Sequence, residues 1–184
     1  MERFTLDPTL YNGRPADCTD RDAVETACYD FLDGLGVDYR RVDHSETPSI
    51  EACATVEKLL GIEICKNLFL CNRQKTQFIL LLMPGRKEFR TKELSAQLGC
   101  SRQSFADAAH MQEYLGVTPG SVSILGLLND KERRVRLVID RDALAHDFFG
   151  CHPCRNTTSL RIATADIREK ILPALGHEAT YVSL

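Results

Sequence analysis

The 184-residue chain contains no apolar run close to the roughly 18 residues that a membrane-spanning helix needs. Its longest run is Phe78-Ile79-Leu80-Leu81-Leu82-Met83, a length that suits a buried strand. The N-terminus also lacks the charged and then apolar pattern of a secretory signal. We therefore expect no membrane association and a cytoplasmic location.

A surplus of positive charge is missing as well, since the net charge is -3, which argues against a general nucleic-acid binder. The charge is unevenly distributed, however. Residues 1–65 carry 6 basic and 14 acidic side chains, whereas residues 66–102 carry 8 basic and 2 acidic ones. This local excess fits either a phosphate-binding face or a set of solvated turn and helix residues.

Several familiar motifs are absent. The chain has no Walker loop, no G-x-S-x-G nucleophile elbow, no internal repeat and no linker. We therefore expect one domain over residues 1–184. Its first 19 residues are expected to be irregular, because Pro8, Gly13 and Pro15 break regular structure there.

The eight cysteines are scattered over a chain with ample core material, which favours reduced thiols. Cys151 and Cys154 form one C-x-x-C pair, and no partner pair completes a four-ligand zinc site. A redox dithiol would need a helix starting at Cys151, but loop-forming residues follow. Redox chemistry, zinc binding and a cysteine–histidine hydrolase stay open as alternatives, while two small thiols in a loop, with no cofactor, are preferred.

The apolar spacing predicts an α+β fold with a mixed, largely antiparallel sheet and helices outside it. Hairpins dominate the middle of the chain, so a doubly wound sheet is not expected. The predicted helices cover residues 20–35, 49–61, 91–99, 107–115 and 164–175. The predicted strands cover residues 39–42, 67–71, 77–83, 122–125, 135–139, 148–149, 160–162 and 181–184, with 122–125 and 135–139 as a pair.

Lys66 stands at the mouth of an apolar strand, where an unpaired ammonium is costly to bury. It either turns to water or meets an anionic ligand. Two later segments favour a ligand: the glycine- and serine-containing loop 116–123, and residues 150–159, which contain His152. A single histidine is more often structural, but its place between Gly150 and Pro153 leaves ligand contact and a packed structural role equally open.

Four segments in order resemble the YbaK-like family, the editing domains related to prolyl-tRNA synthetase. They are Lys66-Asn67-Leu68-Phe69-Leu70, residues 115–123, Leu127-Leu128-Asn129-Asp130 and residues 149–160. The chain is most similar to the free-standing branch of prolyl-tRNA editing proteins, the ProX or PrdX type. The resemblance extends over nearly the whole chain from Asp20.

The resemblance implies a barrel-like sheet flanked by helices and hydrolysis of the ester between a wrong amino acid and the terminal adenosine of tRNA. We expect a trans-editing hydrolase for mischarged tRNA-Pro, with tRNA as partner and no metal. Prolyl-tRNA synthetase and an elongation factor are further candidate partners. The longer N-terminal helix resembles the alanine-specific branch, so Ala-tRNA-Pro is preferred over Cys-tRNA-Pro. A non-catalytic module that senses aminoacyl-tRNA or an amino acid is the alternative.

The resemblance also assigns residues. Lys66 would hold the ester carbonyl oxygen or the terminal phosphate, and His152 would shape the pocket and orient water. Ile124 stands where the family has proline, so the adjoining loop departs from the family pattern. The remaining substrate-binding residues implied by the family are Asn67, Gly120, Ser121, Val122, Ser123, Asn156 and Thr157.

Overall fold

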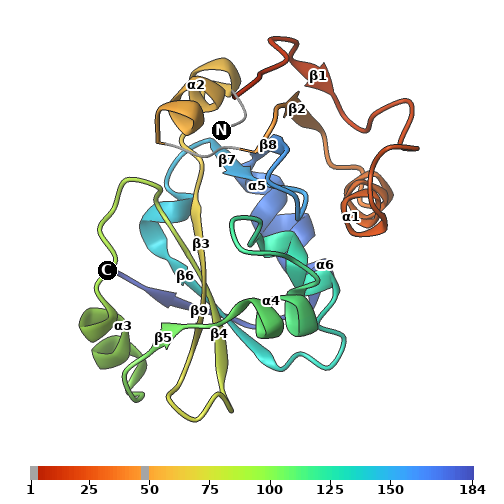
Figure 1. The fold of residues 1–184 in the computed structure, drawn as a ribbon. Coiled ribbons are helices and arrows are strands. Elements are labelled where there is room, and N and C mark those ends of the chain that lie inside the picture. Colours follow the sequence, from red (N-terminus) through yellow and green to blue (C-terminus); the bar gives the residue numbers. More distant parts are fainter. Residues whose placement is uncertain (1–3, 47–49) are drawn as a thin grey trace.

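The structure, a computed structural model, describes residues 4–46 and 50–184 and contains two β-sheets (Figure 1). The first has the strand order β1-β2-β8-β7 and is antiparallel throughout. Its strands are β1 (Tyr11–Asn12), β2 (Tyr39–Asp43), β7 (Phe148–Cys151) and β8 (Thr158–Ala163).

The second sheet has the order β5-β3-β4-β6-β9. The β3–β4 and β3–β5 pairs are antiparallel, whereas β4–β6 and β6–β9 are parallel. Its strands are β3 (Lys66–Cys71), β4 (Phe78–Met83), β5 (Ser104–Phe105), β6 (Val135–Asp140) and β9 (Ala179–Val182).

The two sheets meet just before β3. Ile64 forms a parallel bridge with Gly150 of β7, and the Cys65 amide donates to the Gly150 carbonyl at 3.1 Å. A Cβ on Gly150 would lie 2.6 Å from Ile62 Cδ1 and 3.0 Å from Ile64 Cα, so a larger residue would press on the Ile62 side chain and the Ile64 backbone. The junction joins the two sheets, in keeping with the barrel-like arrangement that the family resemblance implies.

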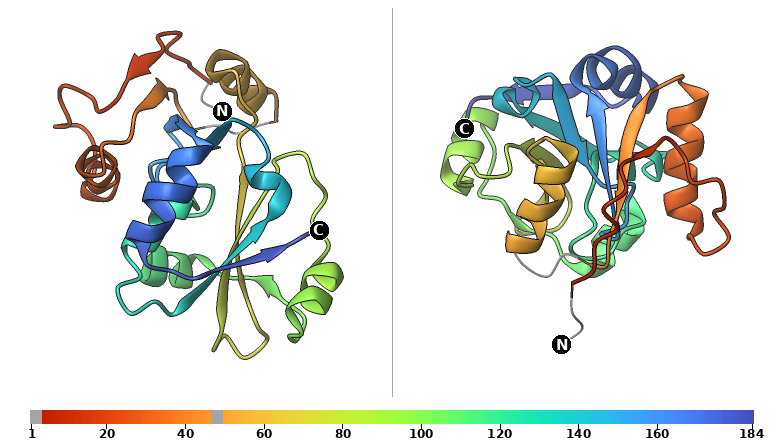
Figure 2. Two further views of the ribbon diagram at one scale, coloured as in Figure 1. Left: turned by 180° about the vertical axis from the view of Figure 1, so that it is seen from behind. Right: turned by 90° about the horizontal axis from the view of Figure 1, so that it is seen from above.

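The helices lie outside the sheets, with α1 and α3 on opposite flanks of the molecule (Figure 2). A continuous apolar cluster between the sheets and the helices includes Tyr29, Phe69 and Phe149, each almost fully buried. None of the helices in the described ranges has the length and apolarity required to cross a bilayer. The α-helices are α1 (Ala23–Gly34), α2 (Ile50–Leu60), α3 (Thr91–Leu98), α4 (Ala108–Leu115), α5 (Thr164–Asp166) and α6 (Leu172–Leu175). The 3₁₀ helices are η1 (Ile124–Leu128) and η2 (Arg141–Leu144), and η3 (Ile167–Ile171) is a π-turn.

The predicted α+β class is confirmed, and so is the hairpin formed by β3 and β4. Asp22 caps α1 by accepting from the Glu25 amide, and Asp107 caps α4 by accepting from the His110 amide. The predicted helix start at Ser49 lies outside the described residues.

The strand predicted over residues 122–125 is wrong. Ser123 instead caps the 3₁₀ helix η1, because its hydroxyl accepts from the Leu125 amide. Strand β6 therefore has no antiparallel partner there and pairs in parallel with β4 and β9.

Two smaller differences concern the chain ends. The first 19 residues are not wholly irregular, since Tyr11 and Asn12 form β1 against β2. The predicted helix over residues 164–175 contains the π-turn η3 before Pro173. Proline removes an amide donor and crowds the preceding turn, and the wider π-turn accommodates both effects.

Candidate functional site

A cavity of about 230 Å³ opens at the edge of β3. Strand β5 pairs only with Leu70 and Cys71, so the first half of β3 is left uncovered on that side. Residues from β3, α4, the loop before η1 and the segment after β7 meet there. The lining residues are Cys65, Asn67, Leu68, Phe69, Phe105, Met111, Gly120, Val122 and His152.

His152 is held by the backbone of its own loop. Its Nδ1 lies 2.9 Å from the Thr158 carbonyl oxygen, so Nδ1 carries the proton and donates. Burial, together with the neighbouring His44, lowers the pKa of His152, although the bond to Thr158 opposes this shift. The imidazole is therefore neutral near pH 7, and its Nε2 has a lone pair with no partner among the described residues.

His44 is a neighbour of the site that the sequence analysis overlooks. Its ring meets that of His152 edge to face, with centroids 6.5 Å apart. Nδ1 donates to the Ser45 carbonyl at 2.8 Å, while Nε2 accepts from the Ser159 hydroxyl at 2.9 Å. Burial lowers the pKa of His44 as well, so the pair is uncharged near neutral pH. Only the strand register between β2 and β8 brings it here, and no local motif marks it.

Two hydrogen bonds join the loop before η1 to the segment that contains His152. Ser123 donates to the His152 carbonyl at 2.6 Å, and Ser121 Oγ accepts from the Asn156 amide at 3.1 Å. Both serines are buried with their hydroxyls occupied by protein, and neither lines the cavity. Gly120 and Val122 line it instead, and Gly120 has φ +87, a conformation that glycine adopts without strain.

Asn67 presents an unsatisfied acceptor. Its Nδ2 donates to the Cys65 carbonyl at 3.1 Å, while its buried Oδ1 has no hydrogen-bond partner among the described residues. A buried acceptor without a donor is costly, so this oxygen is an unusual feature of the cavity lining.

Cys65 also lines the cavity, and burial raises the pKa of its thiol to about 12. The thiol therefore stays protonated, which makes it a poor nucleophile.

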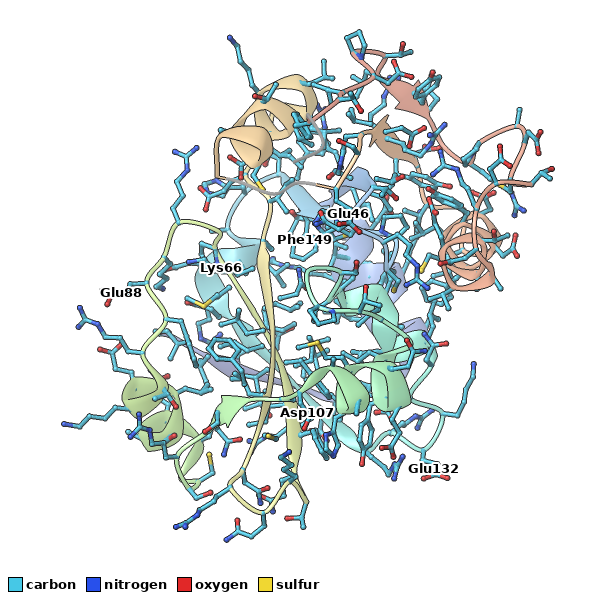
Figure 3. The ribbon with its side chains drawn as sticks, in the orientation of Figure 1. Glu46, Lys66, Glu88, Asp107, Glu132 and Phe149 are labelled. Carbon is cyan, nitrogen blue, oxygen red and sulfur yellow. The ribbon has the colours of Figure 1, made fainter. Side chains whose placement is uncertain are left out.

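Lys66 lies on the other side of β3. It pairs across the ladder with Met83, and cross-strand partners point to the same face. Its Nζ donates to the Lys87 carbonyl at 2.7 Å, and it is absent from the cavity lining. Figure 3 shows Lys66 on the side of β3 that faces the loop carrying Glu88, with Phe149 on the other side. The Lys66 ammonium therefore does not line the cavity that His152 lines.

Asn156 and Thr157 do not line the cavity either. The hydroxyl of the next residue, Thr158, is hydrogen-bonded to two residues from the N-terminal part of the chain. Its hydroxyl lies 3.0 Å from Asp43 Oδ1 and accepts from Arg21 at 2.9 Å, and Arg21 and Asp43 are themselves 2.7 Å apart. Since the Thr158 carbonyl also accepts the hydrogen bond from His152 Nδ1, this charged cluster helps to fix the imidazole.

Much of the basic excess in residues 66–102 is neutralised. Lys87 contacts Asp140 and Asp142 at 2.8 Å each, and Lys75 contacts Asp107 at 2.6 Å. Lys66, by contrast, has no carboxylate within ion-pairing distance among the described residues. Its charge is thus uncompensated locally.

The C-x-x-C thiols are free and buried. Cys154 lies 3.6 Å from Cys28, and burial raises the pKa of Cys151. Both features indicate packed, unreactive thiols. In the described part of the chain, no three His, Cys, Asp or Glu side chains are placed to hold a metal ion.

The model of the aminoacyl-tRNA editing domain matches residues 44–170. The chain is 29% identical to the prolyl-tRNA editing protein ProX of Acetoanaerobium sticklandii, covering 83% of this chain and 93% of ProX. It is 31% identical to the prolyl-tRNA synthetase associated domain-containing protein 1 of Danio rerio, covering 75% and 76% of the two chains.

A solved structure gives a further likeness. It is described as a candidate trans-editing enzyme for prolyl tRNA synthetase, and it superposes with a TM-score of 0.62 at 16% identity. The superposition covers 89% of this chain and 98% of that one. At this identity the likeness supports the fold.

Proposed function

Because the chain belongs to the aminoacyl-tRNA editing domain family, whose members hydrolyse the ester of aminoacyl-tRNA, we propose that it clears mischarged tRNA-Pro in trans, with Ala-tRNA-Pro as its substrate. The observation that carries this proposal is one small cavity whose lining residues supply three polar features: the unpaired acceptor of Asn67, the backbone at Gly120 and the neutral imidazole of His152.

In the proposed ester hydrolysis, His152 accepts a proton from the attacking water. We assign its Nε2 to orient the attacking water, because Nδ1 is already committed to Thr158. The water oxygen bonds to the ester carbonyl carbon and the bond to the ribose oxygen breaks. The water proton passes by way of Nε2 to that ribose oxygen, so the imidazole ends as it began. Positioned acid–base groups of this kind contribute about 10²–10⁴-fold to rates.

Asn67 supports recognition of the aminoacyl group. Its buried Oδ1 lacks a donor, and the α-ammonium of an aminoacyl ester supplies one. The apolar walls from Leu68, Met111 and Val122 would surround a small side chain. Selection against proline would then be steric, since a packed wall resists a larger ring.

Lys66 supports binding of the nucleic acid outside the cavity. Its neighbours Cys65 and Asn67 line the cavity, so the backbone of Lys66 lies next to the cavity opening although its side chain points away. Of the two roles expected from the resemblance, contact with a terminal phosphate fits this position better than contact with the ester carbonyl. We also place the protein in the cytoplasm, with prolyl-tRNA synthetase or an elongation factor as candidate partners.

The test is deacylation of Ala-, Cys- and Pro-tRNA-Pro by the purified chain. We expect rapid loss of alanine and retention of proline. No hydrolysis of any mischarged tRNA-Pro, at enzyme concentrations far above those that a control deacylase needs, would overturn the proposal. Preference for cysteine over alanine would leave the editing activity and overturn the choice of substrate.

A variant pair localises the chemistry. His152→Asn retains a donor toward the Thr158 carbonyl but removes Nε2, so we expect kcat to fall about 10²-fold with the fold unchanged. The matched control is His146→Asn, because His146 is exposed and does not line this cavity.

A further inference from the structure

Phe105 is an aromatic side chain in an unusual place. It is 64% exposed, more than any other large hydrophobic side chain in the described residues. It lies on the two-residue edge strand β5, opposite Leu70 of β3. Single exposed apolar residues are common on protein surfaces, so exposure alone carries no meaning.

The position of Phe105 beside the candidate site suggests a role for its exposed ring. Phe105 lines the same cavity as Asn67, Gly120 and His152. The ring of Phe89 lies 6.1 Å away at 68°, an edge contact that steadies Phe105 without covering it. A fixed aromatic surface therefore borders the opening of the candidate site.

The volume of the cavity limits how much of the substrate it can hold, and the remainder must lie beside Phe105. Sites that enclose most of a drug-sized ligand have volumes of about 300–1,000 Å³, and this cavity has about 230 Å³. It can take the aminoacyl ester and part of the ribose, but not the whole aminoacyl-nucleoside. The base attached to that ribose must lie outside, at the opening, and aromatic side chains are the usual stacking partners of unpaired bases.

We propose that Phe105 is the stacking surface for the terminal nucleobase of the substrate. This inference rests on the proposed function and adds a positioning residue to it. Stacking on Phe105 holds the base, and the ribose joined to that base then places the ester next to His152.

The kinetic test compares Phe105→Ala, Phe105→Tyr and the wild type on the same aminoacyl-tRNA. We expect the alanine variant to raise KM roughly tenfold with little change in kcat, and the tyrosine variant to restore the wild-type KM. The control is Tyr181→Ala, because Tyr181 is 42% exposed but lies on β9 away from the cavity lining. An unchanged KM in the alanine variant overturns the inference.

A binding test is independent of turnover. The chain has no tryptophan, so Phe105→Trp creates a single fluorescent reporter at the proposed contact. Titration with the trinucleotide CCA should change its emission in a saturable way, whereas ribose 5-phosphate, which lacks a base, should not. No response to CCA, or an equal response to ribose 5-phosphate, overturns the inference.

The two proposals fail in different ways. If the wild type hydrolyses no aminoacyl-tRNA but the fluorescent Phe105→Trp variant responds to CCA, the proposed function fails and the stacking contact stands. If the wild type is active but neither KM nor emission depends on position 105, only the stacking contact fails.

Discussion

At the scale of single residues, the half-buried imidazole of His152 lies beside the buried imidazole of His44. His152 donates to Thr158, and His44 is bonded on both ring nitrogens. The sequence marks His152, because a Gly-Cys-His-Pro setting is unusual. It does not mark His44, which reaches the site only through the pairing of β2 with β8.

The lowered pKa values of these histidines predict a pH-dependent stability. Below about pH 6.5 the unfolded chain binds protons that the folded chain does not, so the free energy of unfolding falls as the pH decreases. Each histidine contributes a slope of up to about 1.4 kcal/mol per pH unit below its unfolded pKa. Urea unfolding between pH 7 and 5 measures this slope.

His44→Asn should make that slope shallower, while His146→Asn, at an exposed position, should leave it as in the wild type. Identical slopes for His44→Asn and the wild type would contradict the assignment.

Lys66 shows what a motif can and cannot predict about a residue. The apolar strand around it is found as predicted, but its ammonium donates to the Lys87 carbonyl and Lys66 does not line the cavity. Ser121 and Ser123 are similar: the loop is at the site, but its glycine and valine line the cavity while its serines hold the loop together. The sequence pattern predicts which segments meet at the site. The direction of each side chain depends on strand register and helix caps, which the pattern does not show.

For Lys66→Ala we expect a KM about tenfold higher and a salt dependence of log KM that is shallower by nearly one unit, as for loss of one phosphate contact. Lys66→Arg should retain most binding. Lys92→Ala, which removes an exposed lysine of α3, is the control. A fall in kcat at constant KM would argue instead for contact with the ester.

At the scale of elements, the 3₁₀ helix η1 and its cap determine how the loop meets His152. The apolar residues after Val122 look like a strand in the sequence, and only the Ser123 cap reveals the helix. Ile124 occupies the first position of η1, where proline is well tolerated because that amide has no partner within the helix. The departure from the family proline therefore costs the fold little.

Ser123→Ala removes both the cap and the bond to the His152 carbonyl. We expect the free energy of unfolding to fall by about 1–2 kcal/mol, and activity to fall more than this loss of folded protein explains. Thr118→Ala, at an exposed position of the same loop, is the control. Chemical denaturation and single-turnover deacylation measure the two effects, and wild-type values for both would refute the role given to Ser123.

Ile124→Pro tests the family departure. Because position 124 opens η1, we expect stability within about 1.5 kcal/mol of the wild type and unchanged preference among Ala-, Cys- and Pro-tRNA-Pro. A thermal melt and the deacylation panel give the readout. Unfolding of this variant would show that the Ile124 side chain, which is fully buried, is required for the core.

At the scale of the whole molecule, the α+β class follows from the sequence because helix and strand periods are clear in it. The parallel pairing of β6 with β4 and β9 does not, because it joins segments far apart in the chain. The same is true of the junction between the sheets at Ile64 and Gly150, which sets the distance between β3 and the His152 segment.

Gly150→Ala should therefore separate the sheets. Its Cβ would press on Ile62 and on the backbone of Ile64, so we expect a loss of about 1–3 kcal/mol in the free energy of unfolding and reduced activity. Gly34→Ala is the matched control, because Gly34 ends α1 with open space around it, and it should be neutral or slightly stabilising. Equal stability of the two variants would refute the importance of the junction.

The charged cluster of Arg21, Asp43 and Thr158 lies partly upstream of residue 44, where the match to the editing domain begins. A graft of residues 44–170 into another protein would carry the cavity but leave behind the two groups that steady the Thr158 hydroxyl. The smallest portable version of this site therefore starts ahead of Arg21, and chimaeras between relatives should be joined there rather than at residue 44.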